Sequence, residues 1–131
     1  MSVRFNAIGI VASDLPRSLA FYRMLGLSFA EGAESEGHIE AALPGRARLM
    51  LDTEAVVASF DESFRPPSGA GRISLAFICD TAADVDRIYD QMVAAGCEGE
   101  RSPFDASWGQ RYATVLDPDG NAIDLFAALE A

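Results

Sequence analysis

Apolar, β-branched and aromatic residues fill two short segments near the end of the chain, at 111–116 and 121–126, and predict two β-strands. The residues between them, Asp117-Pro118-Asp119-Gly120-Asn121, predict a turn. Proline presets φ, aspartate and asparagine bond their own backbone, and glycine takes a positive φ. The pattern therefore predicts a β-hairpin. One polar position interrupts its second strand, since Asp124 lies between two apolar residues and must face the opposite side of the sheet from them.

The same order of patterns occurs twice along the chain. Each half is predicted to hold a strand, a capped helix ended by a glycine, a short strand and a hairpin. The halves align on Asp14 and Asp80, about 66 residues apart, as a weak internal repeat in which the second helix is about one turn longer. The predicted segments are strands 3–11, 27–30, 37–43 and 46–52 with a helix from Asp14 to Gly26, then strands 72–79 and 97–101 with a helix from Asp80-Thr81 to Gly96.

The length of 131 residues predicts a single α+β domain, 1–131, built from two βαβββ modules at about 3–52 and 72–128. Residues 53–71, with prolines and glycines late in the segment, predict a linker that holds one irregular helical turn. A βαβββ unit leaves half of its apolar surface bare. Two copies should therefore pair, within one chain or across a dimer.

Charge and composition narrow the classes of function. The net charge is −10, with ten arginines and no lysine, which argues against nucleic acid as a partner and excludes lysine Schiff-base chemistry. An acidic surface also attracts cationic ligands. No apolar run approaches the roughly 20 residues that span a membrane, and the start of the chain shows no signal-peptide pattern. Cys79 and Cys97 lack the C-x-x-C spacing of a zinc ribbon, so we expect inert thiols in a cytoplasmic protein.

Two stretches, IGIVASDLPRSLAFYRMLGL at 8–27 and WGQRYATVLDPDGNAIDLF at 108–126, carry a resemblance to a known family. The chain resembles the vicinal oxygen chelate superfamily, which includes glyoxalase I, extradiol dioxygenases, fosfomycin-resistance transferases and bleomycin-resistance proteins. Phe21-Tyr22, Leu25-Gly26-Leu27 and the 117–121 turn are close to the family pattern. The resemblance implies two modules whose curved mixed sheet surrounds a groove, with the helices outside.

The resemblance also implies where metal ligands would stand. Metal-dependent members of the superfamily place four ligands, drawn from His, Glu and sometimes Gln, in the groove. The corresponding positions by motif offset are Ala7, Met50, Ser74 and Asp124. One carboxylate alone binds a divalent ion weakly. We therefore expect no metal and no cofactor, and no metal-dependent lyase, dioxygenase or thiol-transferase mechanism.

His38, the single histidine of the chain, is flanked at strand spacing by Glu36 and Glu40. Neighbouring side chains on one face of a single strand point outward in a row and rarely converge on one ion. We therefore expect a solvated polar face at this strand rather than a metal site, with Ile39 and Ala41 facing the core.

Strand alternation predicts which residues face the groove. The other face is uniformly aliphatic and should pack under the helices; it comprises Ile8, Ile10, Leu49, Leu51, Leu75, Phe77, Ile123 and Leu125. The groove face mixes aromatic, small, thioether and charged residues, as small-molecule pockets do. The expected ligand-binding residues are Phe5, Ala7, Arg48, Met50, Ser74, Trp108, Tyr112, Asp124 and Phe126.

Several of these residues also have a purely structural explanation. Met50 and Phe126 are also explained as core residues, and Trp108 as packing at the start of a strand. Asp124 is also explained as the partner of an arginine, either Arg111 or Arg48.

The leading hypothesis is a metal-independent binding protein that sequesters a cationic or planar antibiotic as a homodimer, similar to the bleomycin-resistance branch. The alternative is an enzyme, either a glyoxalase-like or dioxygenase-like lyase or a metal-free isomerase or epimerase with Asp124 as catalytic base. A structural or regulatory module of the same fold is the third possibility.

Overall fold

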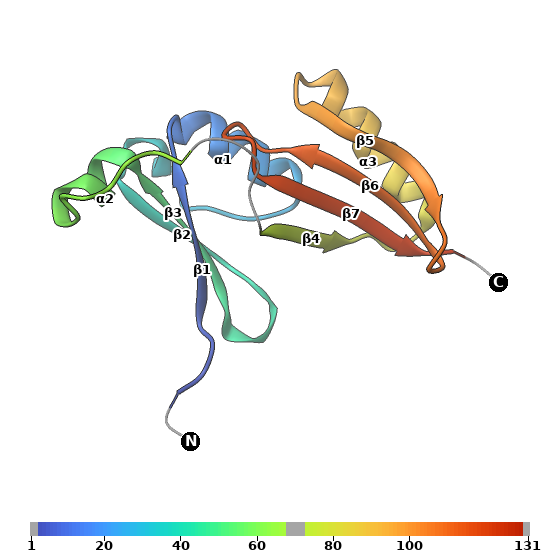
Figure 1. Cartoon of the computed structure of the whole chain (residues 1–131), viewed down its shortest axis with the longest axis horizontal. Helices are drawn as coiled ribbons and strands as arrows, with labels where there is room; N and C mark the ends of the chain where they lie inside the picture. The colour runs from blue at the N-terminus through green and yellow to red at the C-terminus, as the bar shows by residue number, and fades with distance from the viewer. Residues whose placement is uncertain (1–2, 68–72, 130–131) are drawn as a thin grey trace. The chain divides into compact units, whose positions relative to one another are not determined.

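The computed structural model describes residues 3–67 and 73–129, which form two compact α+β units on either side of residues 68–72 (Figure 1). Unit 1 holds a three-stranded sheet and unit 2 a four-stranded sheet. The α+β class predicted from the sequence is confirmed, and the two units are consistent with the predicted βαβββ modules, with all four strands present in unit 2 and three in unit 1. No helix within the described residues is long and apolar enough to cross a membrane.

Unit 1 is a sheet in the order β1-β3-β2, in which β1 runs parallel and β2 antiparallel to β3. Asp14 caps α1 as predicted, accepting a 3.2 Å hydrogen bond from the backbone N of Arg17. The buried side of α1 and the aliphatic side of β3, with Leu49 and Leu51, form the core. The elements are β1 (Ala7–Ala12), α1 (Leu15–Met24), the 3₁₀ turn η1 (Ala33–Ser35), β2 (His38–Ala42), the 3₁₀ turn η2 (Pro44–Arg46), β3 (Arg48–Thr53) and α2 (Glu54–Phe60).

Unit 2 is a complete βαβββ module with the strand order β4-β7-β6-β5. Strand β4 runs parallel to β7, and the other neighbours are antiparallel. Thr81 caps α3, whose 13 residues exceed the 10 of α1, as predicted. Val85 and Met92 of α3 are buried on the side of the sheet that carries Ile123 and Leu125. The elements are β4 (Ser74–Ile78), α3 (Ala82–Ala94), β5 (Glu98–Ala106), β6 (Gln110–Leu116) and β7 (Ala122–Ala128).

The turn between β6 and β7 is built as the sequence predicts. The carboxylate of Asp117 accepts hydrogen bonds from the backbone N of Asp119 at 3.0 Å and of Asn121 at 2.8 Å, and its second oxygen accepts from Nδ2 of Asn121 at 2.8 Å. Gly120 has φ of 86°, in the left-handed region that favours glycine. The turn therefore fixes the register in which β6 and β7 pair.

Two local predictions are wrong. Residues 27–30 form no strand, because the N–H of Leu27 bonds the carbonyl of Tyr22 at the end of α1 and the carbonyl of Ala30 accepts from Ala33 in the next turn. The segment 53–71, predicted as a linker with one irregular turn, begins with the helix α2, and Thr53 caps it by accepting a bond from the N of Val56. Residues 68–71 lie outside the described part of the chain.

The predicted aliphatic faces are buried on the inner strands β3 and β7 and only half-buried on the edge strands β1 and β4. Leu49, Leu51, Ile123 and Leu125 are buried on β3 and β7. Their counterparts on β1 and β4 are only half-buried, because these strands stand at the edges of their sheets; they are Ile8, Ile10, Leu75 and Phe77.

Candidate functional site

Asp124 lies on β7, an inner strand of the unit 2 sheet, directly opposite Thr114 of β6 and Ala76 of β4. Its side chain is buried, with 9% of the residue exposed. The hydroxyl of Tyr112 donates a 2.6 Å hydrogen bond to Oδ2, and the hydroxyl of Thr114 donates a 2.9 Å bond to Oδ1. Two neutral donors on β6 therefore hold the carboxylate in one orientation.

The alternative of an ion pair between Arg111 and Asp124 does not hold, because Arg111 bonds Asp86 and Asp105. Arg111 and Tyr112 are neighbours on β6, so their side chains point to opposite faces of the sheet. Arg111 lies on the α3 side, where it donates to both carboxylate oxygens of Asp86, at 2.8 and 3.0 Å, and to Asp105 at 2.9 Å. The other arginine considered, Arg48, donates to Asn6 and Glu40 in unit 1.

Four aromatic rings gather beside Asp124, and we call them the aromatic group: Phe104, Trp108, Tyr112 and Phe126. Tyr112 stacks with Phe126 at a centroid distance of 6.3 Å and meets Trp108 edge to face at 5.5 Å. Phe104 contacts both Trp108 and Tyr112. Such arrangements are favourable for aromatic pairs. Trp108 is 61% exposed, and its Nε1 donates to Gln110, so it stands at the margin of the group with a ring open to solvent.

The pKa of Tyr112 follows from this setting. Burial of the hydroxyl, together with its hydrogen bond to Asp124, raises the pKa of Tyr112 to about 12. The hydroxyl therefore stays protonated at neutral pH and remains a donor to Asp124.

Strand β4 adds a row of small and apolar side chains to the same face. The register pairs Ser74 with Ala122, Ala76 with Asp124 and Ile78 with Phe126, and all three β4 residues are exposed. The predicted site residues Ser74, Tyr112, Asp124 and Phe126 therefore share one sheet face, opposite the face covered by α3. We call this the Asp124 face.

Sequence reasoning missed Phe104, because the predicted strand stopped at residue 101. The observed strand β5 continues to Ala106 and places Phe104 opposite Tyr112. The apolar Phe104, in the segment just before the hairpin, was the sequence feature that could have indicated a longer strand.

In unit 1 the predicted residues Ala7, Arg48 and Met50 also share a face. The register pairs Ala7 with Arg48 and Gly9 with Met50 across β1 and β3. Phe5 precedes β1 and is 70% exposed. Their role in ligand binding stays a prediction.

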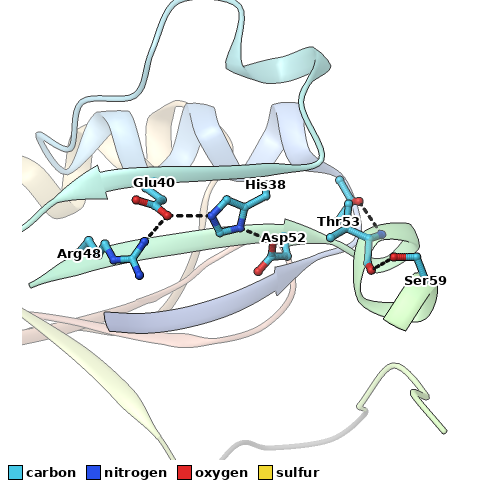
Figure 2. Close-up of polar contacts among 7 residues, drawn as sticks. His38, Glu40, Arg48, Asp52, Thr53 and Ser59 are labelled. Carbon is cyan, nitrogen blue, oxygen red and sulfur yellow. Dashed lines mark hydrogen bonds and ion pairs between the residues drawn. The ribbon is translucent and has the colours of Figure 1, made fainter. Parts of the chain in front are cut away.

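A polar cluster lies on this face of unit 1 (Figure 2). Nδ1 of His38 is 2.5 Å from Oδ1 of Asp52, and Nε2 is 2.8 Å from Oε2 of Glu40. Arg48 donates to the same oxygen of Glu40, and its Nε donates to Asn6 at 3.0 Å. The hydrogen bond to Glu40, and next that to Asp52, raises the pKa of His38 above its usual range. The two hydrogen bonds therefore stabilise the cationic form of the imidazole relative to its neutral form.

The expected solvated face at His38 is confirmed in part. The side chains of His38 and Glu40 are exposed and bond each other, whereas Ile39 and Ala41 are buried. The partner missed from the sequence is Asp52 on the paired strand β3. Glu36 lies before β2, at the end of the turn η1.

The donor set does not fit the metal site that the family resemblance implies. Ala7 and Met50 offer no ligand suited to a hard cation, Ser74 offers only a hydroxyl, and both oxygens of Asp124 accept hydrogen bonds from hydroxyl groups. Across residues 3–67 and 73–129 no three His, Cys, Asp or Glu side chains are grouped so that they could hold a metal ion. At His38 the two carboxylates bond opposite nitrogens of the ring and do not converge.

The cysteines offer no nucleophile. Cys79 and Cys97 are free thiols, and burial raises the pKa of each. Both therefore stay protonated at neutral pH, in agreement with the expected inert role.

Comparisons with known proteins place this geometry in a family. The chain is 28% identical over 129 residues to the uncharacterized protein YraH of Bacillus subtilis, covering 93% of this chain and 96% of that protein. Its fold is similar to a glyoxalase/bleomycin resistance protein/dioxygenase family enzyme from Burkholderia phytofirmans, with a TM-score of 0.79 and 24% identity over 95% of this chain and 98% of that one.

A lactoylglutathione lyase from Agrobacterium tumefaciens has the same fold, with a TM-score of 0.68 and 24% identity over 97% of this chain and 94% of that one. The family model of the Glyoxalase/Bleomycin resistance protein/Dioxygenase superfamily matches residues 4–125. With nearly the whole chain matched, the protein belongs to the Glyoxalase/Bleomycin resistance protein/Dioxygenase superfamily.

Proposed function

We propose that the protein binds a small molecule on the Asp124 face of unit 2 without the help of a metal ion. The observation that carries the proposal is the setting of Asp124, a buried carboxylate held by Tyr112 and Thr114 beside the aromatic group. Within the described residues Asp124 takes part in no ion pair with an arginine or with His38. A carboxylate with free acceptor positions and neutral partners favours a ligand that brings its own N–H donors or positive charge.

The surroundings suggest the rest of the ligand. Tyr112, Phe126 and Trp108 offer ring faces and edges to a planar group. A cation beside these rings gains a cation–π contribution, and the net charge of −10 attracts cations at longer range. The exposed row Ser74, Ala76 and Ile78 leaves room for an apolar part alongside Asp124.

The finer proposal is sequestration, in which a cationic or planar antibiotic is held unaltered by a cytoplasmic homodimer. The absence of suitable ligands at three of the four implied metal positions supports binding without metal-dependent chemistry. An enzyme with Asp124 as catalytic base has no comparable support, since among the residues that the structure describes the hydrogen-bond partners of Asp124 are the hydroxyls of Tyr112 and Thr114.

Fluorescence gives a direct test. Trp108 is the single tryptophan of the chain and is largely exposed, so a planar ligand that stacks on the aromatic group should quench its emission. The probes are a bleomycin-type glycopeptide and a planar cationic dye, titrated against wild type, Asp124→Asn and, as a matched control, Asp105→Asn. Asp105 is a carboxylate of the same sheet that bonds Arg111 instead.

We expect Asp124→Asn to weaken binding of a positively charged probe by about tenfold or more, because hydrogen bonds to charged groups contribute roughly 1.5–3 kcal/mol. Asp105→Asn should bind as wild type does, and mass spectrometry should recover the probe unaltered. Equal affinity of both variants would refute the role of Asp124. Near-stoichiometric zinc, nickel, manganese or iron in purified protein would refute metal independence, and turnover of the probe would refute sequestration.

A further inference from the structure

One carboxylate oxygen in unit 1 is contacted by both a histidine and an arginine side chain. Oε2 of Glu40 lies 2.8 Å from Nε2 of His38 and accepts a hydrogen bond from Nη1 of Arg48 (Figure 2). His38 comes from β2 and Arg48 from β3, and both side chains lie on the sheet face that also carries Met50. Two donors from neighbouring strands thus converge on a single point above the sheet.

Each of the two donors has a second partner that fixes its direction. Asp52 bonds Nδ1 of His38 at 2.5 Å, which leaves Nε2 directed at Glu40. Asn6 accepts from Nε of Arg48 at 3.0 Å, which leaves the terminal nitrogens of the guanidinium free to reach Glu40. The arrangement of His38 and Arg48 therefore does not depend on Glu40 alone.

The interactions that hold the Glu40 side chain in place are solvent-exposed and therefore weak. Its side chain is 38% exposed, and it stands on β2, an edge strand of the unit 1 sheet. Exposed ion pairs contribute only roughly 0.2–1 kcal/mol each. Rotation of the Glu40 side chain into water therefore costs little and requires no movement of the backbone.

We propose that His38 and Arg48 form a receptor for a small monocarboxylate, and that the side chain of Glu40 occupies this receptor until such a molecule displaces it. The occupant present is itself a carboxylate, and the arginine fork matches that planar group. A dianion such as phosphate is disfavoured, because a net charge of −10 repels it more strongly than it repels a monoanion. The receptor is built from residues of unit 1, whereas the Asp124 face belongs to unit 2, and the proposal does not rest on the function proposed for that face.

Met50 indicates what the rest of the molecule would contact. It pairs with Glu40 across β2 and β3 and with Gly9 across β1 and β3, so it lies next to the receptor. Its methyl carbon lies 3.5 Å from the position of a Cβ built on Gly9. A carboxylate with a short apolar tail would rest on this thioether.

The single histidine makes the test selective. The imidazole signals of His38 are the only histidine side-chain signals in an NMR spectrum of the chain, so they report this receptor alone. Sodium acetate and sodium butyrate are titrated at constant ionic strength into wild type, Glu40→Ala and Glu40→Gln. We expect both variants to bind acetate about three- to tenfold more tightly than wild type, because the internal competitor is weakened or removed. Butyrate should bind more tightly than acetate.

Two control variants decide what a shift means. Glu34→Ala removes a different carboxylate, the partner of Arg23 at 2.7 Å, and should respond to acetate as wild type does. The double variant Glu40→Ala/Arg48→Ala should lose the acetate response, since one of the two donors is gone. The proposal is overturned if Glu40→Ala shows no saturable shift with either carboxylate, if the double variant responds equally, or if inorganic phosphate binds more tightly than acetate. Amide spectra of each variant confirm that the fold is retained.

Discussion

The hydroxyl of Tyr112 donates a 2.6 Å hydrogen bond to Asp124 diagonally across strands β6 and β7, two residues along β6 from Thr114, the register partner of Asp124. The bond joins the aromatic group to the buried carboxylate. It follows that Asp124 serves the stability of the sheet as well as any ligand, and the two roles need separate measurements.

Replacing Asp124 by alanine should lower the free energy of unfolding by about 2–3 kcal/mol, because the buried hydroxyls of Tyr112 and Thr114 lose their acceptor. Asp124→Asn keeps one acceptor oxygen and should cost about half as much. Urea denaturation followed by circular dichroism measures both values. Asp90→Ala, at an exposed position of α3, is the control and should change the unfolding free energy by less than about 0.5 kcal/mol. Equal values for Asp124→Ala and this control would contradict the role of Asp124 in stability.

Tyr112 predicts a loss of stability at alkaline pH. Its pKa is raised from 10 in the unfolded chain to about 12 in the folded protein, first by burial and then by the bond to Asp124. The contribution of the protonated Tyr112 hydroxyl to the free energy of unfolding is fully present below pH 10. It is lost as the pH rises toward 12, since Tyr112 releases its proton at lower pH in the unfolded chain than in the folded protein.

The matched variant is Tyr112→Phe, which removes the titrating group. Its unfolding free energy should be about 1 kcal/mol lower than that of wild type at neutral pH, because one hydrogen bond is lost. The gap should narrow between pH 10 and pH 12 as wild type loses stability. A gap that stays constant over that range would mean that Tyr112 titrates normally in the folded protein.

Much of the fold can be predicted from short-range sequence patterns such as turns and helix caps. The hairpin turn at 117–121 and the caps at Asp14 and Thr81 each depend on a few adjacent residues, and the structure confirms them. The errors arise where longer contacts decide. The segment 27–30 has strand-like composition but forms no strand, and the predicted linker begins with α2, a short helix capped by Thr53.

The candidate site shows the same division. Parity along single strands placed Asp124 and Phe126 on one face, and the structure agrees. Contacts between side chains on neighbouring strands were not predicted, because they depend on the register in which the two strands pair. The observed register of β2 and β3, symmetric about Gly45, places His38 opposite Asp52. The same reasoning would have separated Arg111 from Asp124.

His38 predicts a stability change near neutral pH. Hydrogen bonds to Glu40 and then to Asp52 raise its pKa above 6.5 in the folded protein. The contribution to stability is present below pH 6.5 and is lost as the pH rises through the folded pKa, because the neutral ring can donate to only one of the two carboxylates. An NMR titration of the imidazole signals measures the pKa directly.

Variants of the two carboxylates rank their effects on His38. Glu40→Gln should lower the pKa of His38 more than Asp52→Asn does, since the bond to Glu40 is the larger cause of the shift. Glu34→Gln, which affects a separate ion pair with Arg23, should leave the pKa of His38 unchanged. A wild-type His38 that titrates at or below 6.5 would show that neither hydrogen bond persists in solution.

The turn that joins β6 and β7 should be the most sensitive loop of unit 2. Asp117→Ala removes an acceptor for three hydrogen bonds, two from backbone N–H groups and one from Nδ2 of Asn121. We expect the free energy of unfolding to fall by about 2–3 kcal/mol, because the donors lose a buried charged partner.

Gly120→Ala should lower the free energy of unfolding by about 1–2 kcal/mol through its φ of 86° alone, since that conformation strains any residue with a Cβ. Hydrogen exchange should show faster opening of β6 and β7 in both variants, whereas the β1-β3-β2 sheet of unit 1 should exchange at its wild-type rate under conditions where local opening dominates. If Asp117→Ala unfolds at the wild-type urea midpoint with an unchanged slope, the turn is not the element that fixes the register of this hairpin.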